Sequence, residues 1–93
     1  MRISALDQDI LTLLNGNELY GLEVVERINI NRPVQLTFGS VYPALNRLCK
    51  KKLISDRWGD SQEGARRKYF KLTELGRNKL NELEQYRKQL AKS

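Results

Sequence analysis

The segment from Gly39 to Ile54, GSVYPALNRLCKKKLI, limits the fold more than any other part of the chain. At 100° per residue, Val41, Leu45 and Leu48 fall on one side of a helix. The opposite side contains no acidic residue, and it carries Pro43, Asn46, Arg47 and Lys50. These two sides predict a helix that lies between a small core and a polyanion. An ordinary surface helix with a solvated charged side has the same pattern, so the neighbouring segments have to decide.

The positive charge of the chain is confined to this segment and the one that follows it. The 93 residues carry a formal net charge of +6. Between Gly39 and Lys71, nine basic and three acidic residues account for all of that excess, while the other charged residues balance. Charge concentrated in this way is the electrostatic footprint expected of a phosphate-binding surface.

Size and composition indicate one small soluble domain. The hydrophobic fraction is 40% and the charged fraction 30%. No segment has the roughly 20 apolar residues of a membrane span, and no signal peptide is recognisable. Because Cys49 is the only cysteine, no disulfide can form within the chain, which favours a reducing compartment. We therefore expect a cytoplasmic protein without membrane contact.

Capping residues and apolar spacing predict two helices before Gly39. The first runs from about Ala5 to Leu14, with Ser4 as its N-cap. The second runs from about Tyr20 to Ile28, and Gly21 in its first turn costs about 1 kcal/mol of helix propensity against alanine. A glycine there indicates close approach either of a phosphate or of another helix. The expected inner side of the second helix is Leu22, Val25 and Ile28.

Two prolines set the start of the third helix. Pro33 disfavours helix at the preceding residue, so we expect a loop there and then a short strand at Val34–Leu36. Pro43 is tolerated in the first turn of a helix but breaks a hydrogen bond in its interior. We therefore expect the third helix to begin with Ser40, rather than Thr37, as its N-cap.

The pattern then changes to that of a hairpin followed by a last helix. Strands are expected at Ile54–Trp58 and Ala65–Leu72, around a polar turn. Trp58 is expected to belong to the core or to cover the hairpin. The last helix runs from Thr73-Glu74 to about Ala91.

The predicted fold is mainly α with a small β-hairpin wing. The order helix, helix, short strand, helix, hairpin, helix is that of a winged helix-turn-helix with an extra C-terminal helix. Gly39–Lys52 would be its recognition helix. Residues 1–73 would form the DNA-binding part and residues 74–93 a dimerisation helix, within one continuous domain.

Three motifs resemble the PadR family of transcriptional regulators. They are Tyr20-Gly-Leu-Glu, Gly-Ser-Val-Tyr-Pro-Ala-Leu-Asn-Arg-Leu from Gly39, and Arg-Arg-Lys-Tyr-Phe-Lys-Leu-Thr-Glu-Leu-Gly from Arg66. The resemblance implies a homodimeric DNA-binding repressor whose N-terminal and C-terminal helices form the dimer contact. It implies that Tyr42 and Arg47 lie on the DNA side and that Tyr20-Gly21 approaches the DNA backbone. The chain is similar to the short branch of the family, which has no elaborate C-terminal dimerisation domain.

The residue types argue against an enzyme. The chain has no histidine, the commonest general base and a common metal ligand. Cys49 is expected to pack at the edge of the third helix, although its lysine neighbours leave a redox role open. The sequence has no phosphate-cradling glycine loop and indicates no metal or cofactor, and it identifies no small-molecule effector.

Two binding functions remain, and the confined basic charge favours the first. One is sequence-specific binding of double-stranded DNA, and the other is a winged-helix module that contacts protein or RNA. Arg47 and Asn46 suit guanine and adenine respectively, so the third helix is expected to read bases while the wing holds phosphates. The expected DNA-binding residues, with those implied by the resemblance, are Tyr20, Gly21, Ser40, Tyr42, Pro43, Asn46, Arg47, Lys50, Lys51, Arg66, Arg67 and Lys68.

The last helix also predicts a homodimer. Only its start, around Leu75, is expected to reach the chain's own core, which leaves an apolar stripe for a two-fold partner. The opposing interpretation folds this helix back onto its own subunit and leaves a monomer. The expected dimer interface is Leu6, Ile10, Leu80, Leu83, Tyr86 and Leu90. A two-fold dimer would suit a palindromic operator.

Overall fold

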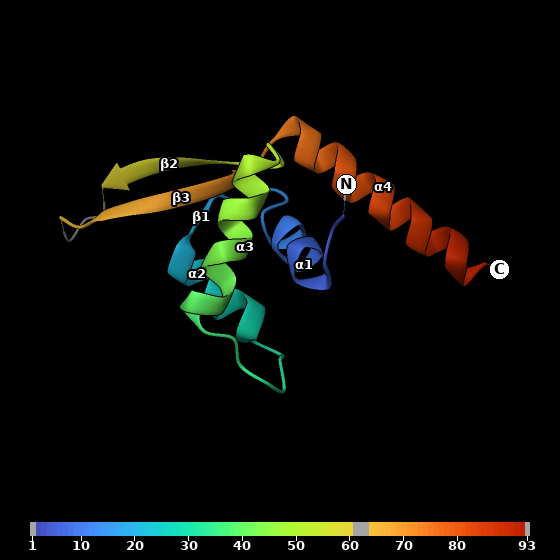
Figure 1. Cartoon of the computed structure of the whole chain (residues 1–93), viewed down its shortest axis with the longest axis horizontal. Helices are drawn as coiled ribbons and strands as arrows, with labels where there is room; N and C mark the ends of the chain where they lie inside the picture. Colours follow the sequence, from blue (N-terminus) through green and yellow to red (C-terminus); the bar gives the residue numbers. More distant parts are fainter. Residues whose placement is uncertain (1, 61–63, 93) are drawn as a thin grey trace.

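The computed structural model describes residues 2–60 and 64–92. The elements in chain order are α1 (Ala5–Leu13), β1 (Leu19–Tyr20), α2 (Gly21–Asn29), α3 (Phe38–Lys50), β2 (Ile54–Asp60), β3 (Arg66–Leu72) and α4 (Glu74–Ala91). The hairpin β2–β3 and α4 extend in opposite directions from a body made of α1, α2 and α3 (Figure 1). The principal extents of 52 × 31 × 20 Å reflect these two projections. None of the helices described is long and apolar enough to span a membrane.

The sheet is antiparallel, with β3 in the centre, β2 on one side and the two-residue strand β1 on the other. The predicted hairpin is confirmed, but the predicted strand at Val34–Leu36 is wrong, because that segment is irregular. Its backbone is held by a side chain instead: the Asn29 amide donates to the Leu36 carbonyl at 2.8 Å and accepts from the Leu36 N–H at 2.9 Å. These bonds satisfy the backbone N–H and C=O of Leu36, the last residue of the predicted strand.

The core joins α1, α2 and α3 to the inner side of the sheet, and the start of α4 closes it. Its largest fully buried apolar side chains are Ile10, Leu11, Leu14, Val24, Val41, Leu45, Leu48, Leu53, Ile54, Phe70 and Leu80. In α2 the inner side differs from the prediction: Val24 and Val25 are buried, whereas Leu22 is 54% exposed. Gly21 is buried with them, so the inner stripe begins one position earlier than the sequence pattern suggested.

The third helix begins three residues before the predicted start. Thr37 is the N-cap, and its hydroxyl accepts a hydrogen bond from the Ser40 N–H at 3.2 Å. Pro43 is consequently inside the helix, and the prediction of Ser40 as N-cap was wrong. The bond that Pro43 cannot make would have gone to the carbonyl of Gly39, an exposed residue that water can reach. This exposure explains why a proline is tolerated there.

The start of α4 is pressed against the connection between α3 and β2. Thr73 caps the helix by accepting from the Gly76 N–H at 3.0 Å, and its hydroxyl bonds the Lys52 carbonyl at 2.7 Å. A Cβ on Gly76 would lie 1.9 Å from the Leu53 carbonyl oxygen, so only glycine fits. Leu80 is 1% exposed while Leu75 is 51% exposed, so the expectation that Leu75 reaches the core was wrong.

Candidate nucleic-acid interface

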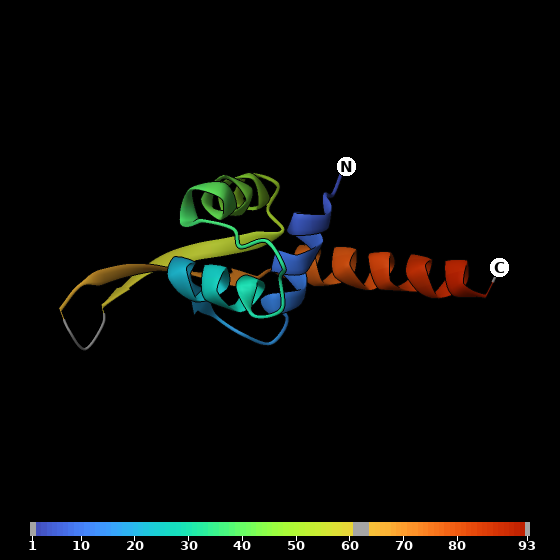
Figure 2. The same ribbon diagram turned by 90° about the horizontal axis from the view of Figure 1, so that it is seen from below.

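The outward side of α3 is the centre of the candidate interface. In Figure 2, α3 lies above the sheet, and the hairpin projects away from α4. Pro43, Asn46 and Lys50 are exposed and occupy the middle of that side, opposite buried Val41 and Leu45. Among the described residues Lys50 forms no ion pair. These positions are therefore open to a ligand along the length of the helix.

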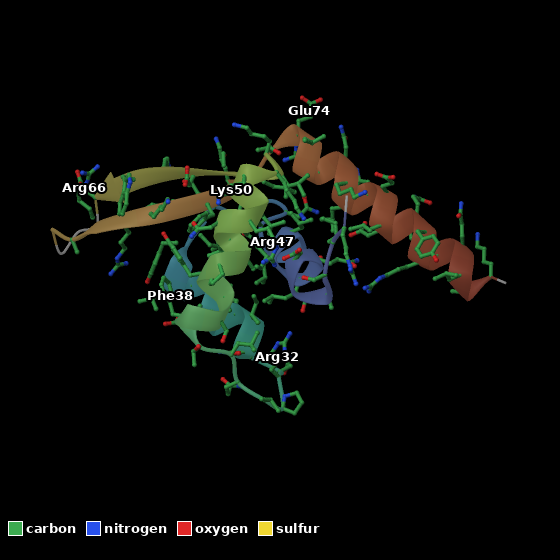
Figure 3. All side chains as sticks on the ribbon, viewed as in Figure 1. Arg32, Phe38, Arg47, Lys50, Arg66 and Glu74 are labelled. Atoms are coloured by element: carbon green, nitrogen blue, oxygen red, sulfur yellow. The ribbon has the colours of Figure 1, made fainter. Side chains whose placement is uncertain are left out.

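Arg47 is held differently from its neighbours on α3. Its Nη2 donates to the Asp7 Oδ1 at 2.6 Å, and Figure 3 shows it between α3 and α1. The Arg47 side chain is 45% exposed, whereas that of Asp7 is 2% exposed. The sequence analysis placed Arg47 on the outward side, but the structure places it on the flank that faces α1.

Lys51 also lies on the flank toward α1. Its ammonium donates to the Arg2 carbonyl at 2.8 Å, so the predicted DNA-binding residue is in contact with the N-terminal segment. Ser40, at the N-terminal end of α3, is exposed, and its hydroxyl lies 3.2 Å from that of Thr37. Pro43, Asn46 and Lys50 thus form the open centre of α3, whereas Arg47 and Lys51 lie on the flank that contacts α1 and the segment before it.

The wing cations rest on aromatic rings and a surface acid. The Arg66 guanidinium lies 5.6 Å from the centroid of the Trp58 ring, and that of Arg67 lies 4.3 Å from the Tyr20 ring. The Lys68 ammonium is 3.0 Å from the Asp56 carboxylate, and this hydrogen bond raises the pKa of Lys68 above its ordinary value. Arg66 lies toward the far end of the hairpin (Figure 3). The predicted turn residues Ser61, Gln62 and Glu63 lie outside the described part of the chain.

An aromatic hollow of about 300 Å³ lies where α2, α3 and the wing meet. Phe38 and Tyr42 stack on each other with ring centroids 4.9 Å apart, and both line it together with Trp58. Trp58 is 58% exposed, so of the two places expected for it, in the core or covering the hairpin, the core is wrong. Strand alternation puts Trp58 on the same side as buried Ile54, but it cannot predict that this side is exposed at Trp58.

Gly21 forms part of the floor of this hollow. It is buried, and a Cβ there would lie 2.9 Å from the Phe38 ring. Of the two explanations left open by the sequence, the structure shows close helix packing. Tyr20, which precedes α2, is half-buried, and its backbone N–H donates to the Glu23 carboxylate at 3.1 Å.

The ion pair between Arg57 and Glu18 was not predicted from the sequence, because its partners are far apart in the chain. The Arg57 guanidinium donates to both carboxylate oxygens of Glu18, at 3.0 and 2.6 Å, and lies 4.8 Å from the Tyr69 ring centroid. The hydrogen bonds from Arg57 lower the pKa of Glu18 below its ordinary value. Arg57 is thereby fixed beside β1, on the side of the wing close to the body.

The surroundings of Cys49 and of the described acidic residues bear on possible thiol or metal chemistry. Cys49 is half-buried, and burial raises the pKa of its thiol, which opposes thiolate formation. Across residues 2–60 and 64–92, no group of three or more cysteine, aspartate or glutamate side chains is placed to hold a metal ion.

The residues predicted for the dimer interface fall into two groups. Ile10 and Leu80 are 0% and 1% exposed and belong to the core of their own subunit, so they have no surface for a partner. Tyr86 and Leu90 are 60% and 55% exposed on the projecting part of α4. Leu6 and Leu83 are half-buried between these extremes. Near them, the Arg87 guanidinium donates to the Gln8 side chain of α1 at 2.9 Å.

Two solved structures are similar to this one over nearly the whole chain. A PadR-like transcription factor from Bacteroides fragilis is 34% identical, with a TM-score of 0.84 over 94% of this chain and 84% of its own. A PadR family transcription regulator from Clostridium difficile is 30% identical, with a TM-score of 0.85 over 96% and 93%. The similarity to both structures confirms the winged helix-turn-helix fold that the sequence predicted.

A third structure is more distant and supports the fold alone. Bacillus subtilis PadR, solved in complex with operator DNA, is 23% identical, with a TM-score of 0.77 over 88% of this chain and 48% of its own.

The model of the transcriptional regulator PadR-like family matches residues 10–82. The chain therefore belongs to the PadR-like family of transcriptional regulators.

Proposed function

We propose that the protein is a sequence-specific double-stranded DNA-binding regulator, a cytoplasmic homodimer that represses transcription from a palindromic operator. The observation that carries this proposal is the charge: the whole net charge of +6 lies in the stretch that forms α3 and the wing. A module that only contacts protein needs no such excess, whereas phosphates attract it. A protein with the same fold, B. subtilis PadR, was solved in complex with operator DNA.

Within this proposal, α3 enters the major groove and the wing follows the backbone. Asn46 and Lys50 stand in the open centre of α3, where side chains can reach base edges. Arg66, Arg67 and Lys68 supply phosphate contacts from the wing, and Tyr42, Tyr20 and the N-terminus of α2 border the hollow between them. Pro43 lies on the same outward side as Asn46.

The proposed dimer uses the projecting half of α4. Leu83, Tyr86 and Leu90 recur at helical spacing; Tyr86 and Leu90 are exposed, and Leu83 is half-buried beside them. A two-fold partner that covers them would place two recognition helices on one side of the duplex. Their separation would be about 34–36 Å, one turn of DNA.

Selection of bound sequences from a random duplex pool tests this function. A palindromic consensus with two half-sites one turn apart is the expected result. Enrichment of no sequence, or equal affinity for single-stranded RNA and duplex DNA, would exclude operator-specific binding. Placing the selected operator over a promoter, with transcription measured with and without the protein, separates repression from activation.

Sedimentation tests the dimer separately. Leu83→Glu with Leu90→Glu should leave the domain folded, give a monomer, and lower operator affinity because each half-site is then bound alone. Ile30→Glu with Val34→Glu is the matched control, since these side chains are 71% and 72% exposed in the loop before α3. Sedimentation of the wild-type protein as a monomer at tens of micromolar would exclude the dimer.

A further inference from the structure

Asp7 is an unusual residue for the position it occupies. Among the described residues it is the only charged side chain that is fully buried, at 1% exposure. Its Oδ2 accepts from the Ser4 N–H at 3.2 Å, while the Ser4 hydroxyl accepts from the Asp7 N–H at 3.0 Å. This capping box begins α1 and uses one carboxylate oxygen. The other oxygen is left for a partner outside the helix.

That partner is Arg47, 40 residues further along the chain. A buried carboxylate needs a paired charge, because removal of one member of a buried pair shifts a folding equilibrium by roughly 10²-fold or more. The half-exposed guanidinium puts this pair near the lower end of that range. A good bidentate contact between arginine and guanine favours the right base by roughly 5–150-fold. If Arg47 left Asp7 to make such a contact, the cost of the broken ion pair would cancel most of that gain.

The helical wheel gives an independent reason. At 100° per residue, Arg47 is about 60° from Lys50, which stands in the middle of the outward side of α3. Lys51, one turn beyond Arg47 on the same flank, donates to the Arg2 carbonyl. Arg47 and Lys51 thus join two consecutive turns of α3 to residues 2–7. Both side chains lie away from the centre of the outward side.

We propose that Arg47 is a positioning residue, which fixes α3 against the N-terminal end of α1 and does not itself read a base. The proposal rests on the proposed DNA-binding function. The guanidinium has five N–H donors in a fixed fork, and one is committed to Asp7. The others remain able to meet a backbone phosphate. Base reading belongs to Asn46 and Lys50, and Arg47 sets the angle at which α3 presents them.

The pair also connects the two parts of the proposed machinery. α1 packs on both α3 and α4, and Arg87 of α4 bonds Gln8, the residue next to Asp7. One line of contacts between α3 and the proposed dimer helix therefore passes through Asp7 and Arg47, beside the contact of the start of α4 with the connection between α3 and β2. A looser pair should tolerate a wider range of distances between the two half-sites.

Three variants, Asp7→Asn, Arg47→Gln and the double variant, decide between positioning and base reading. Each is measured by urea unfolding, by affinity for the selected operator, and by affinity for operators whose half-sites are moved by one or two base pairs. Arg47→Gln should be the least stable, because it leaves a buried charge without a partner. The double variant should regain about tenfold of the unfolding equilibrium constant, because a neutral amide pair replaces the ion pair.

On DNA, Asp7→Asn should bind the operator several-fold more weakly although Arg47 is intact. It should also tolerate altered half-site spacing better than the wild type. The double variant should keep the wild-type base preference at every operator position. Lys50→Gln is the control: it should leave the unfolding midpoint unchanged and lose base preference.

Opposite results overturn the proposal. If Asp7→Asn binds as tightly as the wild type or more tightly, the carboxylate only competes with DNA for Arg47. If the double variant is as stable as expected but has lost preference for one base, Arg47 reads that base. Additive effects on unfolding would show that the pair does not couple the helices. Failure of the wild type to bind any duplex would instead refute the proposed function, and the unfolding measurements would still test the coupling.

Discussion

The recognition helix and the wing share the positive charge of the chain, but they hold it in different ways. On α3, Arg47 is committed to a buried carboxylate, and Lys50 stands on an open surface between rigidly packed turns. On the wing, Arg66 lies over an exposed indole and Lys68 pairs with the surface residue Asp56. Contacts of the second kind are weak and exchange easily with a phosphate. In the proposed DNA complex, Arg47 would therefore orient α3, whereas Arg66 and Lys68 would attract the DNA backbone.

The largest effect should come from the open centre of α3. Asn46→Ala should weaken operator binding by about 1–3 kcal/mol if it makes one good base contact, while random duplex binding changes little. Competition between labelled operator and random duplex measures both. An equal loss of affinity for operator and for random duplex would show that Asn46 does not read a base, and that α3 is no more selective than the wing.

Neutralising the wing should have a smaller and less selective effect. Arg66→Gln with Lys68→Gln should lower affinity for every duplex and reduce the slope of log affinity against log salt by roughly 0.9 per lost phosphate contact. Titrations between low and physiological salt give the slope. A constant ratio of operator affinity to random-duplex affinity would show that the wing, unlike α3, adds no sequence preference. An unchanged salt slope would show that the wing does not touch the DNA backbone.

Trp58 allows a weaker test of the same idea. Because it is the only tryptophan, its fluorescence should change when the wing meets DNA. Trp58→Ala should weaken binding to all duplexes by about 0.5–1 kcal/mol, the strength of a cation–π contact at an exposed site. Trp58→Phe, which keeps an aromatic face, should lose less. Identical affinities for the three proteins would show that the indole does not hold Arg66 in place.

The smallest effect concerns the inner end of the wing and depends on pH. Since Arg57 lowers the pKa of folded Glu18, their contact stabilises the protein above the unfolded pKa of about 4.3 and is lost as pH falls through the lower folded value. Wild type should therefore lose slightly more stability than Glu18→Gln between pH 5 and pH 3. Glu26→Gln, at an exposed glutamate without an ion pair among the described residues, is the control.

Local patterns were enough to predict most of the fold. Ser4 and Thr73 were correctly identified as the starts of α1 and α4, because capping is a matter of three or four residues. The rule for Pro43 failed because it takes no account of solvent around the freed carbonyl. Strand β1 was missed because two residues carry no periodicity and pair only after β3 is in place.

The candidate site was less predictable than the fold. The outward position of Asn46 and Lys50 follows from helical spacing alone. The partner of Arg47 does not, because it lies 40 residues away on another helix. Asp7 did carry a signal, an acidic residue between the apolar positions Leu6 and Ile10, but the same residue also suits the positive end of a helix. Only packing decides between these two explanations.

Gly76 makes α4 a lever with a fixed pivot. The helix has 18 residues and is therefore about 27 Å long, so a tilt of about 10° at its base moves its far end by about 5 Å. Backbone contact with Leu53 leaves no room at that base for even a methyl group. In the proposed dimer, the packing of Gly76 at the start of α4 thus sets the distance between the two recognition helices. Adding or removing a helical turn beyond Leu80 would change that distance and leave the packing at Gly76 intact.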